Sequence, residues 1–350
     1  IMPGDADRFE LNAYSQRAAM VSDAAEALVS QTVPKSVYWV EHGGGDTSRQ
    51  RTIGMACAPI EVGPLLKEHL FRQDYSVVLT SATLATRRVK EREPTETAET
   101  AFAHTLARLG CEGAKTHQLG SPFDYARQVE FYIDTTVDHA RGGNARSTNT
   151  RSAPGRGKLA ERILHHLEAT EGGAFVLFTS FATLNSVASA LAGPLAHRGW
   201  PLLAQGRDGS RTLILQRFRE NEHSVLLGAA SFWQGVDVRG RGLRNVIITK
   251  LPFDPPDRPL TQARCELIEE RGGNPFMEDS IPRAVIRFKQ GFGRLIRSQE
   301  DSGRVVVMDS RILTARYGRL FLQALPEGVE PRVVGAEEER GEERLDDLPF

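Results

Sequence analysis

The strongest constraint on the fold is a regular alternation of short apolar segments and longer amphipathic segments between residues 174 and 324. The apolar segments are rich in Val, Ile and Leu and predict buried strands, whereas apolar residues three or four positions apart predict helices. Such alternation is typical of βαβ units, in which helices cover both faces of a parallel sheet. We expect an α/β fold, with strands at 174–178, 202–204, 224–228, 245–249 and 304–308 and helices at 181–195, 211–220, 261–271 and 282–297. A last helix follows the strand at 304–308 and ends at about residue 324.

The residues before 158 predict a less regular arrangement, with helices at 7–28, 61–72 and 98–109 and strands at 36–41, 76–79 and 129–133. Residues 141–158 are rich in Gly, Ser, Asn and Thr, contain five basic residues and no acidic one, and predict a linker. This linker is either a flexible surface insertion or a strap that follows nucleic-acid phosphates. After Pro326 the sequence becomes strongly acidic, which predicts a solvated tail.

The composition excludes several classes of protein. The 44 Lys and Arg residues balance 45 Asp and Glu residues, so a nucleic-acid surface would have to arise from local placement of charge. Cys57, Cys111 and Cys265 lie too far apart for a disulfide framework or a zinc finger, and no apolar run of membrane-spanning length is present. We expect a cytoplasmic protein in a reducing setting. Since the sequence begins at Ile1 within a helical pattern, we also expect a piece of a longer protein.

A nucleotide-binding loop of the form G-x-x-x-x-G-K-[ST] is missing from the 350 residues. Gly157-Lys158 is followed by Leu159, and Lys115-Thr116 is preceded by Ala114 where glycine would let the backbone approach phosphate. No acidic pair ends an apolar strand to hold Mg²⁺. By itself, the chain therefore lacks the parts that bind and polarise ATP.

Three segments nevertheless are candidates for the edge where open α/β sheets bind ligands, at the carboxyl ends of the strands. The first, TSATL at 80–84, offers the hydroxyls of Ser81 and Thr83, although such a segment more often caps a helix. The second, AASFWQGVDVR at 229–239, contains Gly235 for a tight turn and Asp237 to accept hydrogen bonds. Its Phe232 is expected to fill the core, while for Trp233 both core packing and stacking on a base stay open.

The third segment, QGFGRLIR at 290–297, holds Gln290, Arg294 and Arg297 at spacings of four and three. A helix would place these three side chains on one face, with the two guanidinium groups suited to phosphate oxygens. Gly293 would let another backbone come close. Taken alone, this pattern is usually a solvated helix face, but the apolar residues opposite would anchor it.

Together these segments closely resemble the DinG/XPD branch of superfamily-two DNA helicases, and its DinG side more than its XPD side. The matching stretches are VVLTSATL (77–84), GSPFDYARQVEFYI (120–133), AFVLFTSFATL (174–184), LLGAASFWQGVDVRG (226–240), NVIITKLPFDPPDRP (245–259), NPFMEDSIPRAVIRFKQGFGRLIRS (274–298) and DSGRVVVMDSRI (301–312). They follow the family order over most of residues 36–325.

The resemblance implies two RecA-like lobes that close on ATP and Mg²⁺ while single-stranded DNA crosses both. It implies roles for motif III in coupling nucleotide state to DNA grip, for motif IV in binding DNA, for motif V in joining the nucleotide and DNA sites, and for motif VI in reaching the γ-phosphate with arginine fingers. Motif III matches Ser81 and Thr83, and motif IV matches Thr179 and Ser180. Motif V matches Gly235 and Asp237, and motif VI matches Gln290, Arg294 and Arg297. Gly235, Asp237 and Gly293 are counted with the ATP-binding residues. Trp233 is counted with the DNA-contacting or coupling residues.

The resemblance also defines what this chain lacks. The family's Walker A and Walker B motifs and its four-cysteine iron–sulfur segment precede motif III, and none occurs here, so any cluster would be held by another part of the parent protein. By the same resemblance, residues 1–35 form the end of the helical arch, 36–134 the returning part of lobe one, 135–157 the basic linker, 158–325 the complete lobe two and 326–350 the acidic tail.

The leading hypothesis is the C-terminal part of an ATP-dependent DNA helicase, inactive as a fragment, that works on single-stranded DNA and on forked or damaged duplexes. We expect a monomer, associated with the nucleoid in a bacterium. The alternative is a non-catalytic module that binds nucleic acid or a protein partner. A nuclease-linked relative is a third, weaker hypothesis, because the sequence shows no acidic nuclease motif.

Overall fold

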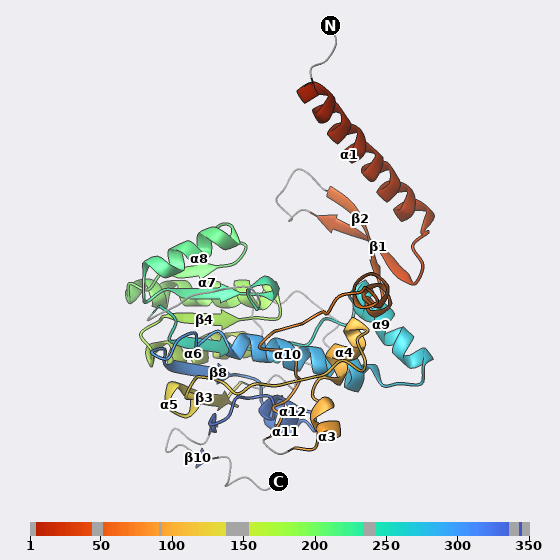
Figure 1. Ribbon diagram of the computed structural model, residues 1–350. Helices are drawn as coiled ribbons and strands as arrows, with labels where there is room; N and C mark the ends of the chain where they lie inside the picture. Colours follow the sequence, from red (N-terminus) through yellow and green to blue (C-terminus); the bar gives the residue numbers. More distant parts are fainter. Residues whose placement is uncertain are drawn as a thin grey trace. The chain divides into compact units, whose positions relative to one another are not determined.

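The computed structural model describes residues 5–43, 52–90, 93–137, 154–233, 242–335 and 343–344 (Figure 1). The chain divides into two compact units, which are described separately. The smaller unit comprises Ile1–Val77, Leu106–Gly113 and Pro255–Phe276, and the larger one comprises Val78–Thr105, Ala114–Asp254 and Met277–Phe350.

The smaller unit contains a long helix and an antiparallel hairpin. The expected helix at 7–28 is α1 (Asp5–Ser30), and the expected strand at 36–41 is β1 (Ser36–Gly43). β1 pairs with β2 (Thr52–Pro59), a strand that the sequence analysis missed, from Ser36 opposite Pro59 to Gly43 opposite Thr52. Helix α9 (Pro259–Glu270) packs on β1, and α2 (Gly63–Leu66) continues into a π-helical turn at Lys67–Phe71.

The larger unit is built on one sheet with the strand order β10-β9-β3-β8-β7-β4-β6-β5. Seven of these strands are parallel, and the short β10 pairs antiparallel with β9 at one edge. Their bounds are β3 (Val129–Asp134), β4 (Ala174–Leu177), β5 (Leu202–Ala204), β6 (Val225–Gly228), β7 (Asn245–Ile248), β8 (Gly303–Val307), β9 (Pro331–Val334) and β10 (Glu343–Arg344).

Helices cover both faces of this sheet, because alternate residues of each buried strand point to opposite sides. On one face Val176 and Phe178 pack with α6 (Pro154–Glu168) and α7 (Phe181–His197). On the other face Phe175 and Leu177 pack with α8 (Arg211–Glu220), α10 (Ile281–Phe292) and α12 (Gly318–Leu322). The remaining α-helices of the described residues are α3 (Thr95–Glu99), α4 (Ala103–Leu109), α5 (Tyr125–Gln128) and α11 (Arg311–Thr314). The expected α/β fold with a RecA-like lobe is confirmed.

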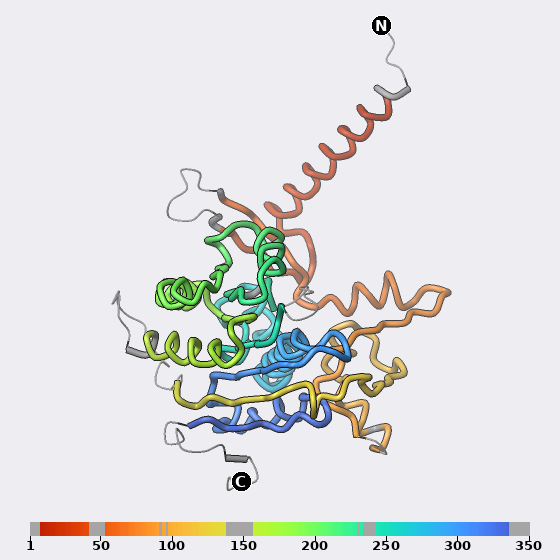
Figure 2. Tube along the Cα trace, turned by 90° about the vertical axis from the view of Figure 1, so that its left-hand side faces the viewer, coloured from red at the N-terminus to blue at the C-terminus, as the bar shows by residue number. Residues whose placement is uncertain are grey.

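Two parts of the sheet differ from the sequence analysis. β3 was grouped there with lobe one, but it lies between β8 and β9, with Val129 opposite Gly303 and Phe131 opposite Pro331. Figure 2 shows this segment running beside strands that come much later in the chain. β9 belongs to the stretch expected as a solvated tail; its PRVV segment is only partly exposed and pairs with β3 instead.

The expected helices at 98–109 and up to about 324 are each divided into two short helices, α3 and α4 in the first case and α11 and α12 in the second. Three other predicted elements are wrong in type or extent. Residues 76–79 are irregular rather than a strand, and Val78 is 82% exposed, because no strand of the described sheets pairs with the segment. The helix expected at 282–297 ends at Phe292, where Gly293 forms its C-cap. Residues 154–158 of the expected linker form the first turn of α6, and residues 138–153 lie outside the described part of the chain.

Candidate functional site

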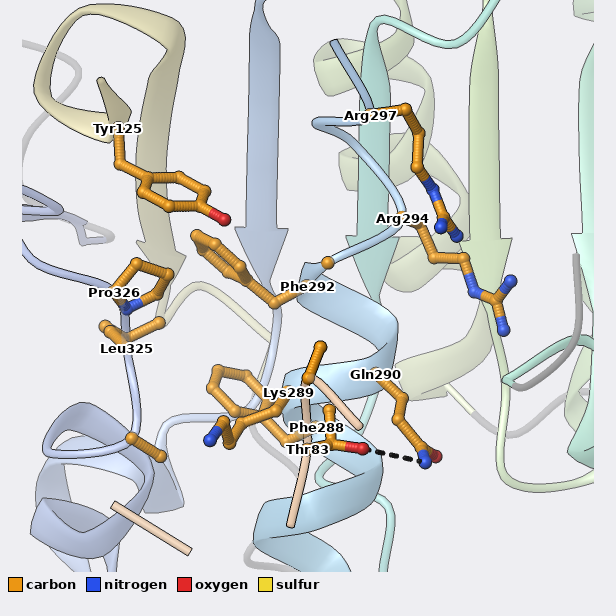
Figure 3. A pocket seen from close by; sticks show the side chains of 13 residues that line it. Thr83, Tyr125, Phe288, Lys289, Gln290, Phe292, Arg294, Arg297, Leu325 and Pro326 are labelled. Atoms are coloured by element: carbon orange, nitrogen blue, oxygen red, sulfur yellow. Dashed lines mark hydrogen bonds between the residues drawn. The ribbon is translucent and has the colours of Figure 1, made fainter. Parts of the chain in front are cut away.

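A pocket of about 600 Å³ lies within the larger unit at the C-terminal end of α10 (Figure 3). One side is apolar, with the rings of Tyr125 and Phe292 at a centroid distance of 6.3 Å. On the other side, Figure 3 shows the amide of Gln290 and the guanidinium groups of Arg294 and Arg297. The lining residues are Ala82, Thr83, Tyr125, Phe288, Lys289, Gln290, Phe292, Gly293, Arg294, Arg297, Ala324, Leu325 and Pro326.

Helix α10 fixes the position of this pocket because one of its faces is buried in the core. The buried side chains recur at helical spacing, and Pro282 lies in the first turn, where its missing N–H costs nothing. With that face against the sheet, residues 289 and 290 are left at the pocket. The buried apolar side chains of α10 are Ile281, Ala284, Val285, Phe288 and Phe292.

Arg294 and Arg297 follow the helix in a turn. The N–H of Arg294 donates to the carbonyl of Gly291 at 3.2 Å, and Leu295 and Ile296 are buried in the core between the two arginines. Both arginines still line the pocket, and Figure 3 shows their side chains on the same side of it as Gln290. Arg294 is only 4% exposed, whereas Arg297 is exposed to solvent. The site thus presents two permanent positive charges from a non-helical segment.

Gln290 connects this segment to the TSATL segment more than 200 residues earlier. Its Nε2 donates to the hydroxyl of Thr83 at 3.4 Å, while its Oε1 is buried without a hydrogen-bond partner among the described residues. Ser81 is exposed, and its hydroxyl accepts from the N–H of Thr83 at 3.2 Å. The structure therefore brings together Thr83, Gln290, Arg294 and Arg297, which the sequence analysis placed in two separate motifs.

Lys289 is a residue of this pocket that the sequence analysis missed. Its Nζ donates to the carbonyl of Ala85 at 2.7 Å, and burial lowers the pKa of its ammonium group to about 8. Desolvation disfavours the charged form, and no carboxylate is among the causes of the shift. In the sequence, the only feature that could have indicated a role for Lys289 at the pocket was its position immediately before Gln290.

The beginning of α10 is anchored by ion pairs that the sequence analysis also missed. Arg283 pairs with Asp254 and with Asp279, the latter at 3.1 Å, and Arg287 pairs with Asp254 at 2.8 Å. The i, i+4 spacing of the two arginines could have indicated this face. These partly buried pairs hold the helix at the end opposite the pocket.

The other predicted site residues have different outcomes. Thr179 and Ser180 are exposed directly after β4, and the hydroxyl of Ser180 caps α7 by accepting from the N–H of Thr183. Trp233 is 1% exposed, with its Nε1 donating to the carbonyl of Phe178 at 3.0 Å, so in this structure its ring packs in the core, which is one of the two expected interpretations. Gly235 and Asp237 lie outside the described residues.

The part of the chain that the structure describes does not fit an iron–sulfur cluster. Within it, no group of three or more His, Cys, Asp or Glu side chains could hold a metal ion. Cys57, Cys111 and Cys265 are partly buried and not disulfide-bonded, and four thiolates are the usual ligand set of a cluster. None of the helices at the described positions is long and apolar enough to cross a membrane.

Comparison with known proteins identifies the type of domain. Residues 163–328 match the family described as the helicase C-terminal domain. The chain is 36% identical over 317 residues to the ATP-dependent DNA helicase YoaA of Escherichia coli, which covers 90% of this chain and 45% of that protein. It is also 36% identical over 284 residues to the 3′-5′ exonuclease DinG of Bacillus subtilis, covering 79% of this chain and 28% of that protein.

A solved structure of an XPD helicase has the same fold, with a TM-score of 0.51 and 19% identity over 80% of this chain and 46% of that chain. The chain spans less than half the length of these curated relatives. These matches confirm the resemblance on which the sequence analysis relied.

Proposed function

We propose that this chain, a DinG/XPD-like superfamily-two helicase sequence with a helicase C-terminal domain, supplies the second lobe of an ATP-dependent DNA helicase. The observation that supports the proposal is the convergence of Arg294, Arg297 and Gln290 at one pocket, where Gln290 donates a hydrogen bond to Thr83. In this role the arginines act on ATP that is held mainly by a Walker-bearing lobe, together with Mg²⁺.

The proposed chemistry is electrostatic. Charge develops on the transferring phosphoryl group of ATP, and preoriented guanidinium groups stabilise that charge most strongly where water is excluded. Arg294 suits this task because it is largely shielded from solvent at the pocket. Arg297, which is exposed, can approach phosphate as the lobes close.

Coupling to DNA is assigned to the Thr83–Gln290 contact. A change at the phosphate alters the position of Gln290, and the hydroxyl of Thr83 passes that change to the TSATL segment. Thr179 and the exposed hydroxyl of Ser81 are the proposed contacts to the phosphates of single-stranded DNA. Forked or damaged duplex DNA is the proposed substrate of the whole protein, which we place in the cytoplasm.

The test is the ATPase activity of the full-length gene product, with and without single-stranded DNA. We expect Arg297→Ala to lower kcat by roughly 10³-fold or more, the range of arginine fingers in related phosphate enzymes. Because Arg294 is buried, Arg294→Lys accompanies Arg294→Ala, and the Tm of each variant is measured as a check on folding.

Arg316→Ala, which removes an exposed arginine outside the pocket, is the matched control and should leave kcat unchanged. Wild-type turnover in folded Arg294→Ala and Arg297→Ala proteins would contradict the finger assignment. A wild-type protein that binds single-stranded DNA without hydrolysing ATP would favour the binding module instead.

A further inference from the structure

Arg297 lies beyond the end of α10, so contacts other than helical hydrogen bonds must hold its backbone. Asp301 provides the first of these contacts. Its Oδ2 accepts from the N–H groups of both Arg297 and Ser298, each at 2.8 Å. Hydrogen bonds to an ionised carboxylate are short and strong, and one oxygen on two successive amides fixes the orientation of that peptide.

Gln128 provides the second contact, from a position about 170 residues earlier in the chain. Its Nε2 donates to the carbonyls of Ser298, Gln299 and Asp301 at 3.1, 3.2 and 2.8 Å. A side-chain amide has two N–H groups, so three acceptors share them. Gln128 is only 8% exposed, and a buried donor without a partner is costly, which commits this side chain to the loop.

The register of the sheet explains why these residues meet. Val129, the first residue of β3, lies opposite Gly303, the first residue of β8, so Gln128 and Asp301 approach the same end of two neighbouring strands. On the other side of Arg297, Leu295 and Ile296 are buried in the core. The loop is thus restrained at both ends while the Arg297 side chain stays exposed at the pocket.

We propose that Gln128 and Asp301 are positioning residues that hold Arg297 where it reaches the phosphate of the nucleotide. This inference rests on the proposed function of Arg297. Neither residue lines the pocket, so each acts through the loop rather than on the substrate. A displacement of about 1 Å in a catalytic group can lower the reaction rate by about 10²-fold. Loss of the contacts that restrain this loop should therefore slow ATP hydrolysis.

The kinetic test uses the full-length gene product, with Gln128→Ala, Gln128→Glu and Asp301→Ala made singly and combined with Arg297→Ala. We expect each single variant to lower the DNA-stimulated kcat by about 10–100-fold, with the KM for ATP nearly unchanged. Gln128→Glu keeps the shape but loses both donors, so it should be at least as impaired as Gln128→Ala. In the Arg297→Ala background none of the three should lower kcat further.

Two exposed residues provide matched controls: Gln216→Ala on α8 and Glu300→Ala within the loop itself should leave kcat unchanged. If Gln128→Ala or Asp301→Ala lowers kcat by the same factor with and without Arg297, the positioning role is overturned. Gln128 is buried beside the sheet, whereas Asp301 lies on the partly exposed loop. If the Gln128 variants do not fold, Asp301→Ala provides the same comparison of kcat with and without Arg297.

Amide hydrogen exchange tests the restraint without depending on ATP hydrolysis. In Asp301→Ala, a peptide covering residues 295–301 should exchange about tenfold faster at Arg297 and Ser298, as the loss of one charge-assisted bond predicts. Unchanged exchange would overturn the proposal. If the wild-type protein hydrolyses no ATP, the proposed function fails, whereas the exchange measurement still decides whether these two residues restrain the loop.

Discussion

At the scale of single residues, Lys289 is the unusual group of the pocket because its ammonium is buried against a carbonyl. Burial lowers its pKa to about 8, below the ordinary value of about 10.4 in an unfolded chain. Between these two pH values the unfolded chain holds a proton that the folded protein has lost. The contribution of Lys289 therefore raises the free energy of unfolding as pH increases from about 8 toward 10. Below pH 8 this increase is absent.

The corresponding prediction concerns Lys289→Met, which cannot titrate. Its free energy of unfolding, measured with urea between pH 7 and 10, should lack the rise that Lys289 contributes, of at most about 1.4 kcal/mol per pH unit. Lys115→Met, at an exposed lysine, serves as the control and should keep the wild-type slope. Identical slopes for wild type and Lys289→Met would show that the ammonium is hydrated.

At the scale of elements, the C-terminal turn of α10 packs on Trp233 without room for a larger residue. A Cβ added to Gly291 would lie 2.9 Å from Cζ3 of Trp233 and 3.3 Å from Leu177. Overpacking of this kind costs about 1–3 kcal/mol, while the better helix propensity of alanine returns about 1 kcal/mol. The close approach places the segment of Arg294 against the core.

Gly291→Ala should therefore lower the free energy of unfolding by about 1 kcal/mol in a urea titration. Gly157→Ala is the matched control, because Gly157 lies in α6 and an added Cβ there meets nothing within 4 Å. That control should stabilise the protein by up to about 1 kcal/mol. A Gly291→Ala protein as stable as the control would mean that Trp233 shifts freely.

The elements also show which parts of the fold could be predicted from the sequence. Strands such as Ala174–Leu177 and Leu202–Ala204 were predictable because they are short, apolar and buried on both faces. Strand β9 was missed since PRVV resembles a tail until its pairing with β3 is known. Residues 76–79 have the composition of a strand, but a strand also requires a hydrogen-bonded neighbour, which composition cannot reveal.

The site was predictable to a similar degree. The spacing of Gln290, Arg294 and Arg297 indicated a shared surface, and these residues do line one pocket. The expected helical presentation was wrong, because Gly293 ends the helix and a turn carries both arginines. Gln128 and Asp301 could not be found from spacing, since their contacts depend on the register between β3 and β8.

At the scale of the whole molecule, the 350 residues contain the proposed fingers but no phosphate-binding loop. We therefore expect the isolated chain to release no phosphate from ATP above background, with or without single-stranded DNA, in a colorimetric assay. Its affinity for single-stranded DNA should be weak and fall steeply with salt, because phosphate contacts release counterions. DNA-stimulated turnover by this chain alone would refute the assignment of ATP binding to another lobe.

The place of β3 in the sheet has a consequence for biosynthesis. Both of its neighbours, β8 and β9, are translated long after it, the nearer one about 170 residues later. At about 5–20 residues per second, a ribosome needs roughly 10–30 s to deliver that partner. Throughout this interval β3, with its apolar residues Val129, Phe131 and Ile133, has neither neighbour to pair with. An unpaired strand of this kind favours aggregation, and a pause in translating residues 245–335 would prolong its exposure.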